Sequence, residues 1–154
     1  MSDELASQIA FECGQLEKLI EFYRQVLVRC ADAEPTPIEI PALAAMLHSF
    51  YSGVENIFKR IALEFDGDLP SGEFWHRALL DLMTRPGPGR SAVISLSLAA
   101  RLKQYLQFRH VFRSAYGFLL SWQRMAPLVM ECEATLRLFD KELDVFLQSG
   151  KQDA

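Results

Sequence analysis

The densest run of chemically capable side chains in this sequence lies between Phe108 and Tyr116. If the segment is helical, Arg109, Arg113 and Tyr116 are spaced at i, i+4 and i+7 and share one face. Two guanidinium groups and a phenol on one face would form a clamp for an oxyanion or a phosphate, because each arginine presents a fixed fork of donors. The alternative is an ordinary solvated face with Tyr116 half-buried, and spacing alone leaves both interpretations open.

This segment belongs to a longer stretch of the chain that contains only positive charges. No Asp or Glu occurs between Leu82 and Met130, and the stretch contains seven basic residues: Arg85, Arg90, Arg101, Lys103, Arg109, Arg113 and Arg124. The rest of the chain has 9 Lys and Arg and 20 Asp and Glu, a net charge of −11. The formal net charge of −4 is therefore the sum of a basic element and an acidic body. Either the arginines pair with acids of neighbouring helices, such as Glu131 and Glu133, or the element binds a phosphate-bearing ligand or an acidic partner.

Helices must position these residues, because apolar residues recur at helical spacing almost everywhere and no segment alternates with a period of two. The pattern predicts an all-α fold with four long amphipathic helices and one short helix in an up-and-down bundle. The first long helix is expected over residues 5–30. Thr36 with Glu39 has the spacing of a capping box, so the second should start near there or just after Pro41. The expected short helix spans residues 73–84.

The expected ends of the remaining helices depend on single residues. Ser91 is a plausible N-cap for the third long helix, which should run to about Arg113 or Tyr116. Gly117 and Ser121 mark the next turn. The last helix should end near Gly150, which stands where a C-terminal cap would be.

Length and composition limit the class of protein. A chain of 154 residues, half of them hydrophobic, predicts one domain over residues 1–154. Its acidic balance excludes a nonspecific nucleic-acid or membrane-surface binder. The acidic start lacks the pattern of a signal peptide, and no apolar run is long enough for a membrane span, so a cytoplasmic protein without membrane association is expected.

Cysteines and histidines give no sign of a metal or cofactor site. Three cysteines, far apart, are expected to be reduced thiols packed in the core: Cys13, Cys30 and Cys132. His48 is expected to be an interior or interface histidine with its hydrogen bonds satisfied, and His76 to pack a helix or line a cleft. No metal site and no cofactor are therefore predicted, and no phosphate-binding loop motif occurs.

The segment from Leu102 to Phe118 resembles the signature helix of the HEPN superfamily, and is most similar to its HepT-like toxins. These toxins are encoded beside a minimal nucleotidyltransferase (MNT) antitoxin. The segments from Phe50 to Arg60 and from Trp75 to Leu80, and the start of the last helix at Trp122, are also similar to the family. The resemblance covers roughly residues 5–147.

The resemblance assigns roles to particular residues. Arg109 corresponds to the motif arginine, His110 to the polar residue after it, and Tyr116 to the motif tyrosine, whereas Ser114 occupies the position of the motif histidine. It implies a homodimer that cleaves RNA without metal, through attack of the ribose 2′-hydroxyl on its own phosphate. Histidine would transfer protons, and arginine, which keeps its proton, would stabilise charge. Arg101, Lys103 and Arg113 are expected to contribute, with Arg109, to phosphate and RNA binding.

Serine cannot exchange a proton at neutral pH without an activating base, so Ser114 predicts an attenuated nuclease, a non-catalytic relative or a protein deliberately silenced at this residue. His110 would compensate only through local unwinding or across a dimer, because it points about 100° away from Arg109 in a regular helix. The resemblance also implies regulation, in which the antitoxin transfers AMP to Tyr116 and blocks the phosphate site. The alternative hypothesis is a non-catalytic interaction module that binds a nucleotidyltransferase partner.

Overall fold

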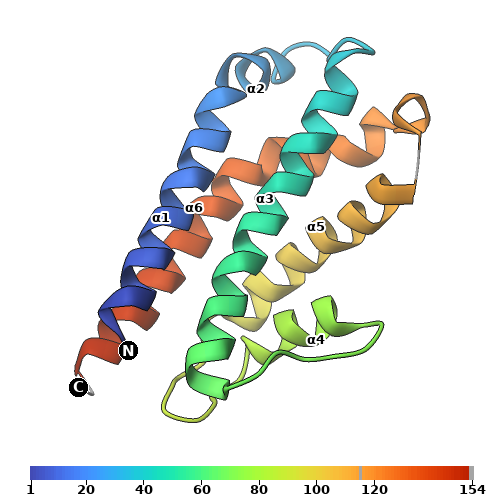
Figure 1. Cartoon of the computed structure of the whole chain (residues 1–154). Coiled ribbons are helices and arrows are strands. Elements are labelled where there is room, and N and C mark those ends of the chain that lie inside the picture. Colours follow the sequence, from blue (N-terminus) through green and yellow to red (C-terminus); the bar gives the residue numbers. More distant parts are fainter. Residues whose placement is uncertain (115, 153–154) are drawn as a thin grey trace.

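The computed structural model describes residues 1–114 and 116–152, and the side chain of Ser114 is not among the described groups. Within that part the chain is helical and contains no strand (Figure 1). The helices are α1 (Asp3–Phe22), α2 (Arg24–Cys30), α3 (Glu39–Ile61), α4 (Trp75–Leu82), α5 (Leu96–Ser114) and α6 (Trp122–Gln152). A π-helical turn, η1 (Ala62–Asp66), extends α3, and a 3-10 turn, η2 (Gly117–Leu119), precedes α6.

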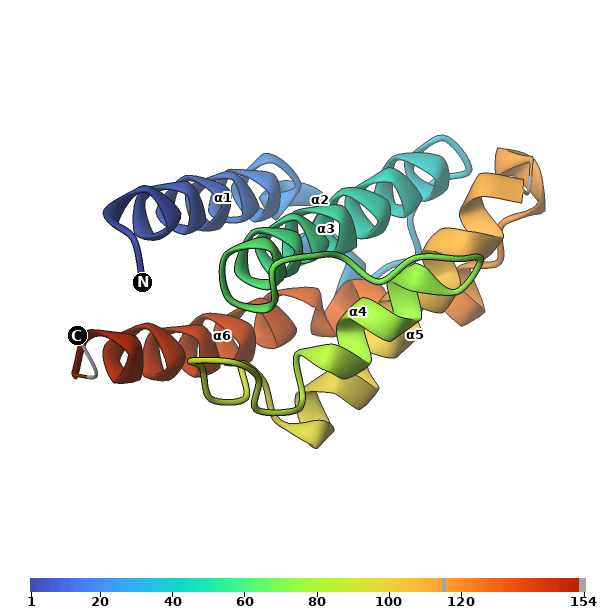
Figure 2. The same cartoon turned by 60° about the horizontal axis from the view of Figure 1, so that its bottom comes forward.

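The four long helices, α1, α3, α5 and α6, run alternately up and down, and the two chain ends lie close together (Figure 1). Helix α3 is central because it contacts α1, α4, α5 and α6. The short helix α4 packs against both α3 and α5 (Figure 2). The predicted all-α fold is therefore confirmed, and the central position of α3 brings its side chains next to those of α4 and α5.

The core forms along the apolar stripe of α3. Phe50 and Phe58 are fully buried and meet α5 and α6 through edge-to-face ring pairs, with centroids 5.0 Å apart for Phe50 and Tyr105 and 5.8 Å for Phe58 and Phe139. Burial of such rings supplies the main driving force for folding, and edge-to-face geometry adds to it. Because this contact fixes α5 against α3, the polar residues farther along both helices have defined neighbours.

The predicted start of the second long helix is confirmed in detail. The Thr36 amide donates to the Glu39 carboxylate at 2.9 Å, and the Glu39 amide donates to the Thr36 hydroxyl at 3.2 Å. This is the reciprocal pattern of a capping box, which satisfies two amide donors that the first turn would otherwise leave without partners.

Several predicted helix limits are wrong. The first segment is two helices, because the backbone at Tyr23 leaves helical geometry (ψ of 3°) and α2 starts anew at Arg24. The N-cap of α5 is Ser95, whose hydroxyl accepts from the Leu98 amide at 3.1 Å, and not Ser91. Helix α6 continues through Gly150 to Gln152. The short helix expected over residues 73–84 is present as α4, and α2 is a second short helix that was not expected.

Cys132 is fully buried, and Cys13 and Cys30 are partly buried against the core. All three are free thiols, as predicted. Burial raises the pKa of Cys132 to about 12 and that of Cys13 to about 11, which disfavours the reactive thiolate. Among the described residues, no helix is long and apolar enough to span a membrane.

Candidate functional site

Arg109 points from α5 into the interior, where α3 surrounds it with polar and aromatic groups. Arg109 is only 5% exposed. The guanidinium donates to both carboxylate oxygens of Glu55, at 3.2 and 3.1 Å, and to the Ser52 hydroxyl at 3.2 Å. It also lies 4.8 Å from the centre of the Tyr51 ring, in cation–π contact. Three residues within two turns of α3 thus hold one arginine of α5.

His76 of α4 completes this cluster. Its Nδ1 atom lies 2.8 Å from Glu55 Oε2 and 3.0 Å from Arg109 Nη2. An ionised carboxylate only accepts hydrogen bonds, so the imidazole donates its Nδ1–H to Glu55, and the approach of Arg109 is a contact between two donors. In a neutral imidazole with this tautomer, Nε2 is the nitrogen that can accept a proton. Trp75 stacks on the imidazole with centroids 3.7 Å apart and fixes the ring plane.

Helical register explains why these side chains converge. His76 is three and four residues before Leu79 and Leu80, the buried residues of α4, so it shares their inward face. On α5, the buried residues Leu98, Leu102 and Tyr105 are followed four residues later by Arg109. Arg109 therefore continues the apolar stripe of α5 and is buried by its position. We refer to the buried residues Glu55 and Arg109, together with the partly buried His76, as the buried triad.

The buried triad changes the chemistry predicted for Arg109. The charge of the guanidinium is balanced by Glu55, and most of its donors are already engaged inside the protein. Arg113, one turn later, is exposed, and Tyr116 lies beyond the end of α5 in extended backbone. The predicted clamp of Arg109, Arg113 and Tyr116 on one helical face is therefore wrong for this structure.

Tyr116 is 72% exposed, and its ring stacks with that of Phe118 at a centroid distance of 5.5 Å. Ser114 is the last residue of α5, and the position of its side chain lies outside the described groups. The prediction that Ser114 occupies a catalytic position stays a prediction.

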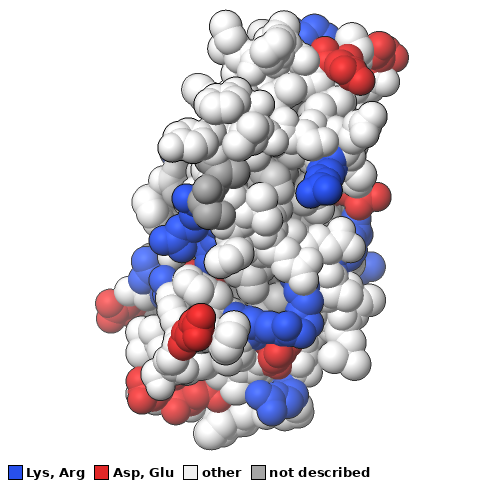
Figure 3. Space-filling model, turned by 90° about the vertical axis from the view of Figure 1, so that its right-hand side faces the viewer, with Lys and Arg blue, Asp and Glu red and all other residues white. Residues whose placement is uncertain are grey.

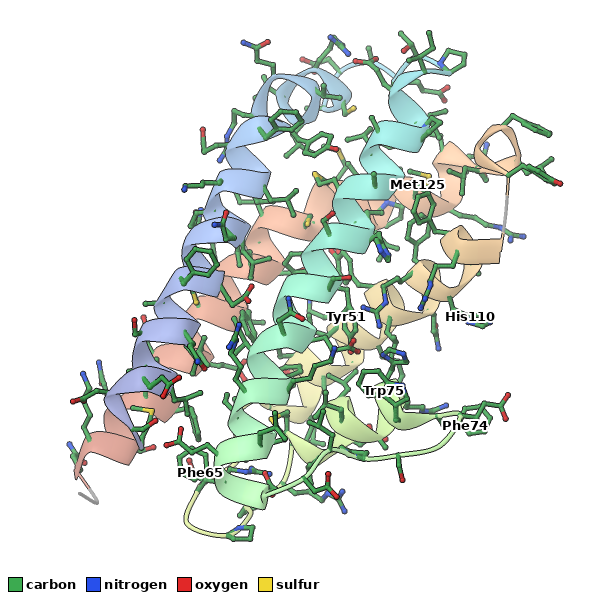
Figure 4. The ribbon with its side chains drawn as sticks, in the orientation of Figure 1. Tyr51, Phe65, Phe74, Trp75, His110 and Met125 are labelled. Atoms are coloured by element: carbon green, nitrogen blue, oxygen red, sulfur yellow. The ribbon has the colours of Figure 1, made fainter. Side chains whose placement is uncertain are left out.

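A pocket of about 420 Å³ lies between α4 and α5, next to the buried triad. It is lined by histidines and basic or polar side chains from both helices, together with apolar residues: Glu73, Phe74, His76, Arg77, Lys103, Leu106, Gln107, His110 and Val111. Figure 4 shows Phe74, Trp75 and His110 on the α4–α5 side of the molecule. The structure thus brings His110 and Lys103, both predicted site residues, to one cavity with His76, for which cleft lining was one of the two predicted roles.

The basic stretch divides into paired and surface residues. Arg90 and Arg109 are buried in ion pairs with Asp66 and Glu55, and Arg101 lies 3.9 Å from Glu131. Among the described residues no ion pair involves Lys103, Arg113, Arg85 or Arg124. On the face in Figure 3, Lys and Arg side chains form separate groups with acids between some of them. On this face the described Lys and Arg side chains therefore make local cationic sites rather than one continuous basic surface.

His48 is partly buried beside Phe112, with ring centroids 5.7 Å apart. The prediction that its hydrogen bonds are satisfied is wrong, because its buried Nδ1 has no partner among the described groups. Burial and the nearby charges of Arg109 and Arg113 lower the pKa of His48, so its neutral form is favoured. Glu133, one of the acids expected to pair with the basic stretch, pairs with Arg24 instead.

Sequence reasoning assigned no role to Tyr51, Ser52 or Glu55, although they lie in the segment that resembles the family. A signal for Glu55 was present, because it is a carboxylate adjacent to buried Val54 and one turn from buried Phe58. An acid on the buried side of a helix needs a cationic or donor partner. The partner of Glu55 is Arg109, which lies 54 residues away in the sequence. This pairing can be known only from the packing of α3 against α5.

The fold and this cluster place the chain among helical proteins with a polar site where three helices meet. A protein-family model described as "HepT-like protein" matches residues 42–149, and the chain belongs to the HepT-like family. Comparisons with curated proteins and with solved structures give no match. Within the described residues, no group of three or more His, Cys, Asp or Glu side chains is arranged to hold a metal ion.

Proposed function

We propose that this protein is the toxin-type component of a HEPN/MNT pair. In this proposal it is an RNA-cleaving homodimer that a partner nucleotidyltransferase neutralises by transferring AMP to Tyr116. Family membership supports the HepT-type role. The RNA reaction needs no metal: the ribose 2′-hydroxyl attacks the adjacent phosphorus, the bond to the 5′-oxygen breaks, and a 2′,3′-cyclic phosphate remains.

The accessibility of Tyr116 is the observation that carries this proposal. All four tyrosines lie in the described part of the chain, and Tyr51 and Tyr105 are buried while Tyr23 is half-buried. Tyr116 is exposed and lies in extended backbone after α5, so a modifying enzyme can reach its hydroxyl. A hydroxyl that must attack the α-phosphorus of ATP has to enter another enzyme's active site, which the buried tyrosines cannot do without unfolding.

Co-expression with the nucleotidyltransferase encoded by the neighbouring gene tests this role. Intact-mass measurement should show the addition of one AMP group, and Tyr116→Phe should abolish it. Tyr23→Phe is the matched control and should leave the modification intact. An unchanged mass for the wild-type protein, or modification of Tyr116→Phe, would contradict the proposal for Tyr116.

The nuclease part is tested with single-stranded RNA in the presence of a metal chelator. Wild-type protein should cleave the RNA, and modification of Tyr116 should suppress cleavage, because the family resemblance implies that the added anion blocks the phosphate site. Arg101, Lys103 and Arg113 are the expected contributors to RNA binding outside the buried triad.

A second candidate function is supported by the state of Arg109 and by Ser114. With its charge balanced inside the protein and a serine in place of the motif histidine, the family's catalytic pair is incomplete. The protein would then be a non-catalytic module that binds the nucleotidyltransferase. Ser114→His separates the two candidates, since a gain of RNA cleavage or toxicity means that this position limits catalysis. If neither form cleaves RNA, the nuclease function is refuted.

A further inference from the structure

We propose that the pocket between α4 and α5 is a nucleotide-binding catalytic site in which His76, oriented by Glu55, is the general base. This inference rests on RNA being the substrate, as proposed above, and names a different proton acceptor from the motif position at Ser114. It is argued from the pairing of His76, the lining of the pocket and the types of group that RNA cleavage requires.

The pairing of His76 with Glu55 is the first step. Glu55 is almost fully buried and holds the Nδ1–H at 2.8 Å, which fixes both the tautomer and the ring orientation. A histidine oriented by a carboxylate, with its second nitrogen directed elsewhere, is the arrangement that hydrolytic enzymes use to make a base. The His76 side chain is 28% exposed and lines the pocket, so the imidazole is reachable by a ligand there.

The lining of the pocket supplies the other groups that a phosphodiester needs. Lys103 and Arg77 provide positive charge for a phosphate, and His110 provides a second imidazole. Phe74 at the rim is 74% exposed and offers a face on which a base can stack. The volume of about 420 Å³ is within the range of small-molecule pockets, roughly 300–1,000 Å³.

Glu73 is the acid among the lining residues. As a hydrogen-bond acceptor it suits an amino group of a base or a ribose hydroxyl, while the phosphate is attracted to Lys103 and Arg77. An exposed aromatic ring, a hydrogen-bond acceptor and two cationic side chains among the lining residues of one pocket favour a nucleotide over a free inorganic anion.

The proposed step is balanced by the two histidines. Nε2 of His76 takes the proton of the ribose 2′-hydroxyl, and the 2′-oxygen forms a bond to phosphorus. The bond from phosphorus to the 5′-oxygen breaks, and protonated His110 gives that oxygen its proton. Lys103 stabilises the extra negative charge on the phosphorane. No metal, oxidant or further reactant is required.

The stacking of Trp75 on His76 provides a direct probe of ligand binding. The chain has two tryptophans, so Trp122→Phe leaves Trp75 as the sole tryptophan, whose emission is excited selectively at wavelengths that tyrosine does not absorb. Titration with uridine 3′-monophosphate should give a saturable change in emission. Lys103→Ala should weaken binding about tenfold or more, since a charge-assisted hydrogen bond is lost. Lys18→Ala, an exposed lysine on α1, is the matched control and should bind normally.

Cleavage of single-stranded RNA tests the catalytic part. His76→Asn places an amide donor near the position of Nδ1, so it can retain the bond to Glu55 while removing Nε2. Cleavage should fall about 100-fold or more, with unchanged helical content. A purely structural role for His76 would be rescued by asparagine. Glu55→Gln disturbs the orientation of His76 and also removes the negative partner of Arg109. Assayed under conditions in which the variant is folded, it should lower kcat more than it raises KM.

The outcomes separate this inference from the proposed function. If the wild-type protein cleaves RNA and His76→Asn cleaves it equally well, the inference is overturned and the nuclease function stands. If uridine 3′-monophosphate binds but RNA is not cleaved, both the nuclease function and the role of His76 as a base are overturned, and nucleotide binding stands. If Trp75 emission shows no saturable response, or Lys103→Ala binds normally, the pocket is not the nucleotide site.

Discussion

Replacement of Arg109 by methionine removes the positive member of a buried ion pair while keeping most of the side-chain volume. The two side chains are only 6% and 4% exposed, so Glu55 would keep its charge in an environment with little water. Breaking such a pair costs about 3–5 kcal/mol of unfolding free energy. Because His76 still donates to Glu55, we expect the lower end, about 3 kcal/mol, which corresponds to a fall in Tm of roughly 6–12 °C for a chain of this size.

A double-mutant cycle isolates the contribution of the pair. Glu55→Gln leaves Arg109 with the Ser52 hydroxyl and the Tyr51 ring, and should cost about 2 kcal/mol. The double variant Arg109→Met/Glu55→Gln leaves neither charge buried. Its cost should be smaller than the sum of the single costs by about 1.5 kcal/mol or more. Urea denaturation followed by circular dichroism measures all four proteins.

Arg113→Met is the matched control, because it removes an exposed arginine one turn farther along the same helix, and its effect should stay within about 0.5 kcal/mol. Additive single effects in the cycle, or a cost below about 1 kcal/mol for Arg109→Met, would refute the inference that the pair stabilises the fold. The result matters for function as well. A loss of RNA cleavage in an Arg109 variant identifies a catalytic role only if the variant is folded under the conditions of the assay.

Three further predictions concern stability and reactivity. Ser95→Ala should lower the unfolding free energy by about 1 kcal/mol in urea denaturation, because the N-cap of α5 is lost. Ser91→Ala should have little effect, and equal effects of the two variants would contradict the assignment of the cap. Burial and nearby Glu17 raise the pKa of Asp140 to about 6, so ionisation of Asp140 weakens the fold as the pH rises through 6. Asp140→Asn should therefore raise the unfolding free energy by on the order of 1 kcal/mol at pH 7.5, and this gain, measured in urea, should disappear near pH 4; a constant gain would contradict it. Cys132 should resist a thiol reagent in the native protein and react only on unfolding, because its burial disfavours the thiolate. Mass spectrometry measures the labelling, and a rate as fast as that of exposed thiols would contradict this prediction.

Local features of the fold could be predicted where a short stretch of sequence determines them. The capping box at Thr36 and Glu39 forms as predicted, since both hydrogen bonds join residues three apart. The prediction of Ser91 as the N-cap was wrong, because the segment before α5 is held by a tertiary contact. The amides of Val93 and Ile94 donate to the Met83 carbonyl, which keeps this segment out of helical geometry.

The same distinction applies to the candidate site. The spacing of Arg109, Arg113 and Tyr116 predicted a shared face, but only a helix extending through Tyr116 would provide it, and α5 ends at Ser114. The burial of Arg109 was available in principle from its register with Leu102 and Tyr105. Its partners were not, because Glu55 and His76 come from helices that meet α5 only through the packing of the fold.

The absence of acids between Leu82 and Met130 has a structural consequence that net charge alone does not convey. A basic residue well inside such a stretch has no acid three or four residues away, so the ion pairs of Arg90, Arg101 and Arg109 join distant parts of the chain. The ion pair of Arg90 with Asp66 connects the loop before α5 to η1, and the ion pair of Arg109 with Glu55 connects α5 to α3. The arginines most buried by the fold therefore act as connections between elements. The positive charge left for a phosphate is that of surface residues such as Lys103 and Arg113, which is why the pocket beside His76, and not the guanidinium of Arg109, is the place to look for bound nucleotide.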